Sequence, residues 1–327
     1  MNDEKYIIVK NLKKYFSTKR GKLHAVDDVS FEIKKGETLG LVGESGCGKS
    51  TLGRCLIRLL DSTSGEVLLK NKDNEDYVDI TKVNAAEMKA LRKRVQIVFQ
   101  DPYSCLNPRL SVWELIAEPL IVNNIYNNSA DMRKRIRELM DTVGLAERLE
   151  NSYPHELDGG RRQRIGIARS LALNPEFIVL DEPVSALDVC IQAQILNLLN
   201  TLQKEFKYTY VFISHNLSVV RHVSDRIAVM YLGQIVELCD YQELFKSPLH
   251  PYTQALLSAI PLAKVNVKRE RIILEGDVPS PIEPPNACRF AGRCRYACDK
   301  CRAGAPELKE HTPGHFVACY RAGELEK

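Results

Sequence analysis

The sequence lacks any apolar run close to the roughly 18 residues that a membrane-spanning helix needs. Its first residues, MNDEK, lack the basic segment and the apolar core of a secretory signal peptide, so we expect a cytosolic protein. The sequence also lacks an excess of charge of one sign, since its net charge is +4 on 327 residues. This balance gives no reason to expect nucleic acid as a partner. What remains is the composition of a globular chain, 44% hydrophobic and 27% charged, long enough for two domains.

A glycine-rich stretch at 43–51 fits the pattern G-x-x-x-x-G-K-[ST], which wraps nucleotide phosphates. Its flanks predict a short buried strand over 38–42 and a helix over 52–60. Glycines let backbone N–H groups turn inward around an anion, and the helix adds the positive end of its dipole. We expect Lys49 to hold the β and γ phosphates and Ser50 to bind Mg²⁺; a plain glycine-rich turn is the alternative. The loop comprises Gly43, Glu44, Ser45, Gly46, Cys47, Gly48, Lys49, Ser50 and Thr51.

An aromatic pair, Tyr15 and Phe16, lies between two strands predicted over 6–9 and 29–33. One of these rings could stack on a nucleotide base, or both could pack beneath the sheet, and the residues alone leave the two alternatives open. A further hairpin is predicted within residues 65–80.

Three predicted strands, over 95–99, 177–180 and 210–214, end at polar side chains. The residues that follow them are Gln100, Asp181 with Glu182, and His215. Two carboxylates after a buried strand are costly unless a cation lies beside them, so we expect Asp181 to bind Mg²⁺ and Glu182 to polarise a water. Gln100 could reach the metal; a solvated glutamine and a structural histidine are the plain alternatives. The alternation of strands and helices predicts an α/β fold with a mostly parallel sheet.

Helices are predicted over 112–122, 130–143, 162–173 and 191–202, and a hairpin over 227–238. Asp158 is a good N-cap for the third helix, and Gly159 and Gly160 leave N–H groups available at its start. This start is a second possible anion site.

In this order the motifs resemble the ATP-binding subunit of an ABC transporter over about residues 5–260. The resemblance implies a P-loop NTPase with a RecA-like core, an antiparallel β subdomain and a helical subdomain over about residues 101–165. It implies an ATP-binding domain over 1–262 and a small Cys-rich C-terminal extension over 263–327. It also implies a dimer in which the phosphate loop of one subunit faces the Leu-Ser-Gly-Gly-Gln signature of the other.

The same resemblance implies roles for single residues. Phe16 is similar to the adenine-stacking aromatic, with Tyr15 as the alternative. Gln100 resembles a contact to both Mg²⁺ and the membrane subunit. Glu182 resembles the catalytic carboxylate, and His215 resembles the switch residue at the γ-phosphate.

A closer resemblance, to the ATPase subunits of oligopeptide and dipeptide importers, rests on FQDP at 99–102, LNPR at 106–109, HPYT at 250–253 and PSPIEPP at 279–285. It implies an ATPase at the cytoplasmic face of the membrane, partnered by a second ATPase subunit, two transmembrane permease subunits and, indirectly, an extracellular peptide-binding protein. The alternatives are another cargo (nickel, glutathione or an oligosaccharide), an ABC ATPase that acts on DNA or ribosomes, and a regulatory cassette that only binds ATP. By itself, the Pro-rich stretch predicts a stiff linker.

Asp158 and Arg161 stand where the family signature has Ser and Gln. A carboxylate at position 158 only accepts hydrogen bonds and repels a phosphate. We hypothesise a heterodimer in which this chain's phosphate loop meets a normal signature, while the partner's phosphate loop faces Asp158 and turns ATP over slowly. The alternative is that Asp158 only caps the helix, as Ser would.

Half of the ten cysteines lie in the last 40 residues: Cys288, Cys294, Cys298, Cys301 and Cys319. Four thiolates can hold zinc or an iron–sulfur cluster. With Cys298 skipped the spacing is C-x5-C-x6-C-x17-C, for which the resemblance implies a [4Fe–4S] cluster. Zinc, with His311 or His315 as a further ligand, is the alternative, followed by unligated thiols. A cluster would staple a tail that is too short to build a core of its own.

The other cysteines are predicted to fall into two kinds. Cys55, Cys190 and Cys239 are expected to be small core residues. Cys47, inside the phosphate loop, is expected to be open to alkylation that ATP would block.

Overall fold

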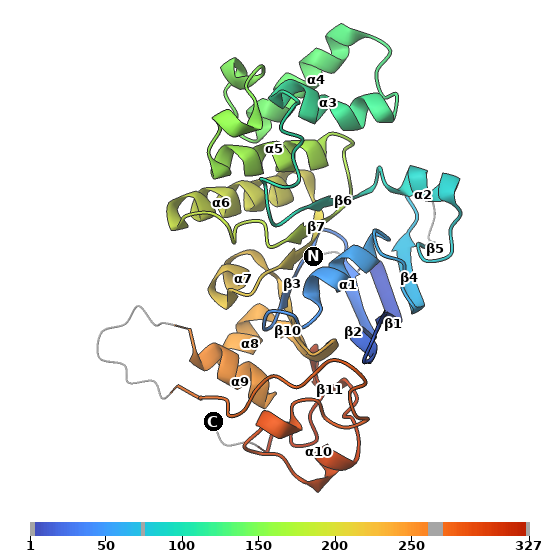
Figure 1. Ribbon diagram of the computed structural model, residues 1–327, viewed down its shortest axis with the longest axis vertical. Helices are drawn as coiled ribbons and strands as arrows, with labels where there is room; N and C mark the ends of the chain where they lie inside the picture. Colours follow the sequence, from blue (N-terminus) through green and yellow to red (C-terminus); the bar gives the residue numbers. More distant parts are fainter. Residues whose placement is uncertain (1–3, 73–75, 261–270, 325–327) are drawn as a thin grey trace. The chain divides into compact units, whose positions relative to one another are not determined.

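The structure, a computed structural model, describes residues 4–72, 76–260 and 271–324 (Figure 1). It divides into two compact units, one made of residues 1–82 and 212–327 and the other of residues 83–211. The first unit is therefore built from both ends of the chain, and the predicted helical subdomain lies within the second. The domain boundary predicted at residue 262 falls in 261–270, outside the described residues, and stays a prediction.

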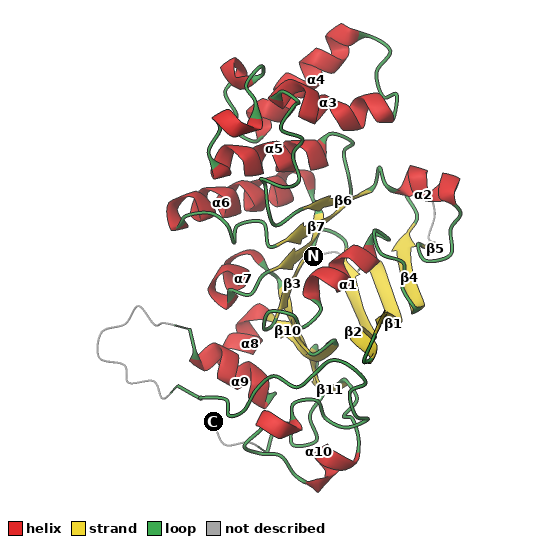
Figure 2. Ribbon diagram, viewed as in Figure 1, coloured by secondary structure: helices red, strands yellow, loops and turns green. Residues whose placement is uncertain are grey.

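The N-terminal sheet of the first unit is antiparallel, with the strand order β2-β1-β4-β5 (Figure 2). Its strands are β1 (Lys5–Thr18), β2 (Gly21–Lys34), β4 (Ser64–Lys70) and β5 (Tyr77–Asp79). Ile7, Val9 and Leu12 of β1 are almost completely buried, as expected for the inner face of a half-covered sheet. The predicted antiparallel subdomain is confirmed, and its first two strands are longer than predicted.

A second sheet of the first unit carries the phosphate loop. In it, β3 (Thr38–Val42) runs parallel to β9 (Arg226–Tyr231), and β9 is antiparallel to β10 (Gln234–Asp240). All five residues of β3 are buried, as in a strand covered on both faces. The helices of this unit are α1 (Lys49–Leu56), α7 (Leu217–Val223), α8 (Tyr241–Lys246), α9 (Pro251–Ser258) and α10 (Asp299–Ala303), with a 3-10 turn η3 (Ala291–Arg293).

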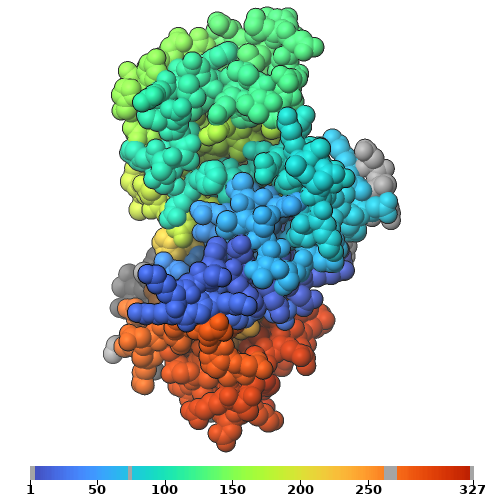
Figure 3. All heavy atoms as spheres, turned by 45° about the vertical axis from the view of Figure 1, so that its right-hand side comes forward, coloured from blue at the N-terminus to red at the C-terminus, as the bar shows by residue number. Residues whose placement is uncertain are grey.

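The C-terminal residues extend this second sheet. β12 (His315–Val317) pairs with β10, and β11 (Lys309–Thr312) pairs with β12. The Pro-rich stretch predicted as a linker is also held, because Pro281 O accepts from His24 N at 2.9 Å and Glu283 N donates to Lys22 O at 2.9 Å. Figure 3 shows the orange and red C-terminal residues against the blue N-terminal strands of the same unit.

Helix α1 is shorter than predicted. It ends at Leu56 instead of Leu60, and Arg58 adopts a left-handed φ of 51°. The Arg58 side chain donates to Asp61 Oδ1 at 3.1 Å and to Ile80 O at 3.2 Å. These contacts hold the turn that ends the helix.

The second unit contains β6 (Val95–Val98), which runs parallel to β7 (Phe177–Asp181), and most of β8 (Thr209–Ile213). Its helices are α2 (Ala85–Leu91), α3 (Val112–Val122), α4 (Ser129–Thr142), α5 (Gly159–Leu171) and α6 (Val189–Phe206), with 3-10 turns η1 (Glu147–Leu149) and η2 (Pro154–Glu156). Ser111 and Glu114 form a capping box that fixes the start of α3 where the sequence predicts it. Within the described ranges, no helix combines the length and the apolar character required to cross a membrane.

Candidate nucleotide-binding site

The phosphate loop leads from β3 directly into α1, and two of its glycines admit no side chain. A Cβ atom on Gly43 would lie 2.1 Å from Met230 O, and one on Gly48 would lie 1.9 Å from Ala25 O. Their φ values of 155° and 106° are also in the region that favours glycine. Lys49 is 5% exposed, and its Nζ donates to Gly43 O at 2.9 Å and to Glu44 O at 3.0 Å. The lysine thus closes the loop around its own ammonium group, where phosphate oxygens would bind.

Cys47 is buried in the loop at 3% exposure, which corrects the expectation that it is open to alkylation. Burial raises the pKa of its thiol, and the nearby Lys49 partly offsets the rise. Cys190 is also corrected: it is exposed, because it lies at the solvated start of α6 and not in the core.

Two side chains from the C-terminal part of the chain hold the loop from outside. The backbone N–H of Glu44 donates to the Tyr252 hydroxyl at 2.8 Å, and the Glu44 carboxylate accepts from both terminal nitrogens of Arg293, at 2.9 and 3.3 Å. The sequence indicated Tyr252 only through the HPYT resemblance, and it did not indicate Arg293. Nothing in their local patterns points to a partner that lies 208 or 249 positions away in the chain.

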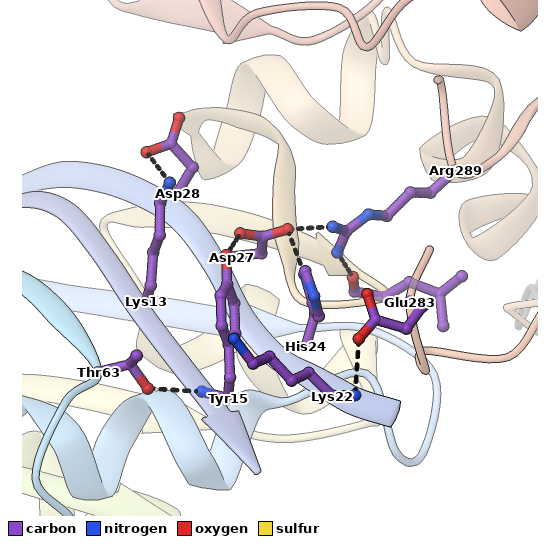
Figure 4. Close-up of polar contacts among 10 residues, drawn as sticks. Lys13, Tyr15, Lys22, His24, Asp27, Asp28, Thr63, Glu283 and Arg289 are labelled. Carbon is purple, nitrogen blue, oxygen red and sulfur yellow. Dashed lines mark hydrogen bonds and ion pairs between the residues drawn. The ribbon is translucent and has the colours of Figure 1, made fainter. Parts of the chain in front are cut away.

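The two candidate base-stacking aromatics differ in their surroundings. The Tyr15 ring stacks on His24 with centroids 4.0 Å apart, and its hydroxyl donates to Asp27 (Figure 4). Phe16 is 36% exposed, with Lys14 Nζ 4.9 Å from the centre of its ring. Tyr15 is therefore engaged by its neighbours, whereas Phe16 presents part of its ring to solvent.

In the second unit, the structure brings Gln100 and Glu182 together. Gln100 Nε2 donates to Glu182 Oε2 at 3.1 Å, although the two residues are 82 positions apart. Asp181 is 1% exposed at the end of β7, and Glu182 has a left-handed φ of 48°. Such a conformation costs about 1–3 kcal/mol for a residue other than glycine and is concentrated at functional sites.

His215 follows β8 and is exposed, in the first unit. The next residue, Asn216, caps α7 by accepting from Ser218 N at 3.0 Å. The histidine therefore lies at the carboxyl end of a buried strand, the position that the sequence predicts.

The signature residues form the start of α5. Asp158 caps it, since Oδ1 accepts from Arg161 N at 2.8 Å, and Oδ2 lies 3.4 Å from the Arg161 guanidinium. A Cβ on Gly160 would come within 2.6 Å of Ile191 Cγ2, and one on Gly159 within 3.0 Å of Leu187 Cδ2. The glycines are therefore needed for close packing against the residues around the start of α6.

A groove of about 360 Å³ lies in the same unit, beside the segment that follows Gln100. Its lining includes Phe99, Pro102, Leu106, Glu118, Val122 and Arg169. The groove thus combines apolar side chains with one ion pair, in which a guanidinium nitrogen of Arg169 lies 2.7 Å from a carboxylate oxygen of Glu118.

In the C-terminal extension, four cysteines line one small cavity: Cys288, Cys294, Cys301 and Cys319. Burial raises the pKa of Cys288 and of Cys319 to about 11, and the neighbouring thiolates add to the rise in both. Among the described residues, no three cysteine sulfurs lie within 4.8 Å of one another.

A buried cluster that the sequence did not indicate joins Glu237 and Cys239 of β10 to His315 of β12. Glu237 Oε1 lies 2.7 Å from His315 Nε2 and accepts from Leu249 N, and Oε2 accepts from His250 N. Both carboxylate oxygens are engaged, so the group acts as a clamp between the extension and the residues before α9. His315 accordingly points to Glu237 and does not line the cysteine cavity.

Three features identify this chain as an ATP-binding cassette of the ABC class. They are the phosphate loop, the carboxylate at the end of a buried strand and the glycine-rich start of a helix. Comparison with known proteins agrees: residues 26–185 match the ABC transporter family, and residues 236–301 match the family described as oligopeptide/dipeptide transporter, C-terminal region. A dimeric ATP-binding cassette solved in a post-hydrolysis state with ADP and Pi has a TM-score of 0.64 at 31% identity, covering 72% of this chain and 98% of that one.

Full-length relatives narrow the class. The oligopeptide transport ATP-binding protein AppF of Bacillus subtilis is 51% identical, and the alignment covers 98% of each chain. The dipeptide transport ATP-binding protein DppF of Haemophilus influenzae is 48% identical, and the alignment covers 94% of each chain. The chain therefore belongs to the family of ATP-binding subunits of oligopeptide and dipeptide ABC transporters, and it is an ATPase.

Proposed function

We propose that this ATPase drives the import of oligopeptides or dipeptides through an ABC transporter. The observation that carries the proposal is the phosphate loop, built by Gly43, Gly48 and Lys49, in a chain that aligns over 98% of its length with an oligopeptide transport ATP-binding protein. Lys49 would hold the β and γ phosphates, Phe16 would stack on the adenine, and His215 would contact the γ-phosphate.

We propose that Mg²⁺ binds together with ATP, because the oxygen donors of the predicted ligands suit this ion. Ser50, Gln100 and Asp181 supply hydroxyl, amide and carboxylate oxygens, which this hard cation prefers. When bound with ATP, the ion would neutralise charge on the phosphates. Glu182 would orient and deprotonate the attacking water, and the bond from Gln100 at 3.1 Å holds the carboxylate in place for that task.

For partners we propose a second ATPase subunit and two transmembrane permease subunits, with an extracellular peptide-binding protein as an indirect partner. The groove beside Gln100 would receive a permease segment, because its apolar side chains include Phe99, the neighbour of the glutamine proposed to contact Mg²⁺. The chain would therefore work at the cytoplasmic face of the membrane as a peripheral subunit.

The test is the variant Glu182→Gln in a transporter reconstituted with its natural partners. The amide keeps the shape and can still bond to Gln100, so ATP affinity should stay within about twofold of wild type. Loss of the general base should lower peptide-stimulated ATP hydrolysis by about 10²–10⁴-fold. A wild-type complex whose hydrolysis ignores peptides but responds to another solute would overturn the proposed cargo.

We also propose that the ATPase dimer is a heterodimer with one weakened site. Asp158 caps α5 as Ser would, yet it places a carboxylate at a position that would face the partner's bound phosphates. Arg161, at 3.4 Å from that carboxylate, compensates for part of the charge. The site formed by the partner's phosphate loop and this signature would bind ATP and hydrolyse it slowly.

For the C-terminal extension we propose a [4Fe–4S] cluster held by Cys288, Cys294, Cys301 and Cys319, which line a single cavity. Bound there, it would cross-link four separate parts of the extension. Absorbance near about 400 nm in anaerobically purified protein would support the cluster. Stoichiometric zinc in a colourless preparation would contradict the cluster and support zinc at this site.

A further inference from the structure

The loop between Cys288 and Cys294 reaches the nucleotide site through two arginines. Arg293 makes a two-bonded contact with the carboxylate of Glu44, inside the phosphate loop, at 2.9 and 3.3 Å. The Arg293 side chain is 9% exposed and that of Glu44 is 28% exposed, so this pair is shielded far more than a surface ion pair. A planar guanidinium that meets a carboxylate through two bonds also fixes its orientation.

Arg289 reaches the edge of the strands that carry the aromatic pair. Its guanidinium donates to Asp27 Oδ2 (Figure 4). It also donates to Leu232 O. The same Asp27 carboxylate accepts from the Tyr15 hydroxyl and lies 3.0 Å from His24 Nδ1. Because Tyr15 also stacks on His24, Arg289 anchors the residue that immediately precedes the proposed base platform.

Phe290 fixes the loop between these two arginines. It is 2% exposed, and its ring lies 5.3 Å from that of Tyr231, 5.5 Å from that of Tyr252 and 5.6 Å from that of His250. Tyr252 is the residue whose hydroxyl accepts from Glu44 N. The loop therefore cannot shift without disturbing the aromatic cluster that also supports the phosphate loop.

We propose that Arg293 and Arg289 are positioning residues for the nucleotide, so that the C-terminal extension completes the ATP site. Arg293 neutralises and orients the Glu44 carboxylate, which would otherwise repel the phosphates. Arg289 holds Asp27 and Tyr15, and through them the strand that presents Phe16. The inference rests on the proposed function, since it assumes that ATP binds to this loop and this aromatic. It also makes the loop with two of the proposed cluster ligands part of the nucleotide site.

Equilibrium titration of the full chain with a fluorescent ATP analogue and Mg²⁺ tests this proposal. Arg293→Met should weaken binding by about tenfold, the size typical of losing bonds between charged groups. Arg295→Met is the matched control: this exposed arginine of the same segment contacts the ring and hydroxyl of Tyr296, and its removal should leave affinity unchanged. Arg293→Lys should fall between the two, because it keeps the charge and loses the fork.

Competition by inorganic tripolyphosphate separates the two arginines. Arg293→Met should weaken both ATP and tripolyphosphate, because it acts on the phosphates. Arg289→Met should weaken ATP several-fold and leave tripolyphosphate unaffected, because it acts on the base. A general loss of structure would weaken the binding of both ATP and tripolyphosphate in both variants, and this result would overturn the assignment of separate roles.

A double-mutant cycle with Glu44→Gln tests whether Arg293 acts through Glu44. In the Glu44→Gln background, Arg293→Met should cause no further loss, and this double variant leaves no unpaired charge that could prevent folding. If the wild-type chain binds no nucleotide, the proposed function is wrong. If it binds and Arg293→Met matches Arg295→Met, the proposed function survives and the positioning role is wrong.

Discussion

Restoring the family signature at the start of α5 should change ATP affinity in opposite directions for the two residues involved. Two unit charges about 4 Å apart at an effective dielectric near 20 interact by about 4 kcal/mol, an upper figure for repulsion between Asp158 and a bound phosphate. The structure reduces it, because the Asp158 side chain is 57% exposed and Arg161, at 47%, lies 3.4 Å away. Exposed pairs of this kind are worth about 1 kcal/mol or less, which corresponds to about fivefold in affinity.

Asp158→Ser should therefore tighten ATP binding by the complex about fivefold and raise its hydrolysis rate. Arg161→Gln alone should weaken binding by a similar factor, because it removes the cation and leaves the carboxylate uncompensated. The double variant should resemble Asp158→Ser. Stability should hardly change, since Ser caps a helix about as well as Asp does, whereas Asp158→Ala should cost about 1 kcal/mol.

The assay is ATP titration and steady-state hydrolysis with the chain assembled with its partner ATPase and permeases, alongside urea unfolding of each variant. Opposite shifts for the two single variants, with unchanged unfolding midpoints, would support the weakened site. If both single variants leave affinity and rate unchanged, Asp158 is only a helix cap and the argument for a degenerate site fails.

Three further predictions follow from buried groups of the first unit. Alkylation of Cys47 at pH 7 should be at least about tenfold slower than that of the exposed Cys190, because burial raises the pKa of the Cys47 thiol. The rate at Cys47 should increase with pH. Equal rates for the two cysteines, measured by mass spectrometry, would contradict the burial of Cys47. Burial lowers the pKa of His250 from 6.5 to about 4, so the unfolded chain binds more protons than the folded chain between these pH values. The free energy of unfolding should therefore fall by about 3 kcal/mol from pH 6.5 to pH 4. His250→Asn, which can still cap α9, should reduce this pH dependence as measured by urea unfolding, and an unchanged pH dependence would refute the assignment. Phe290→Ala should cost about 3–5 kcal/mol of unfolding free energy, and a loss below about 1 kcal/mol would mean that the extension is not anchored by this ring.

The sequence predicted the parts of the fold that depend on local patterns. The phosphate loop, the buried strands before Asp181 and His215, and helix α3 lie where spacing and capping residues place them. Such features are legible because a helix start, a glycine turn or an apolar run draws its stability from residues within a few positions. The end of α1 was missed, since Arg58 is held by Ile80, a residue that no local pattern connects to it.

By itself, then, the sequence determined the chemistry of the nucleotide site: a loop shaped for phosphates and carboxylates at strand ends. Only the tertiary structure decided that Gln100 bonds to Glu182, that Tyr15 is engaged while Phe16 is exposed, and that Arg293 of the C-terminal extension holds the phosphate loop. The physical reason is the same in each case. These contacts join residues far apart in the chain, and their partners are selected by burial and charge pairing once the sheets have formed.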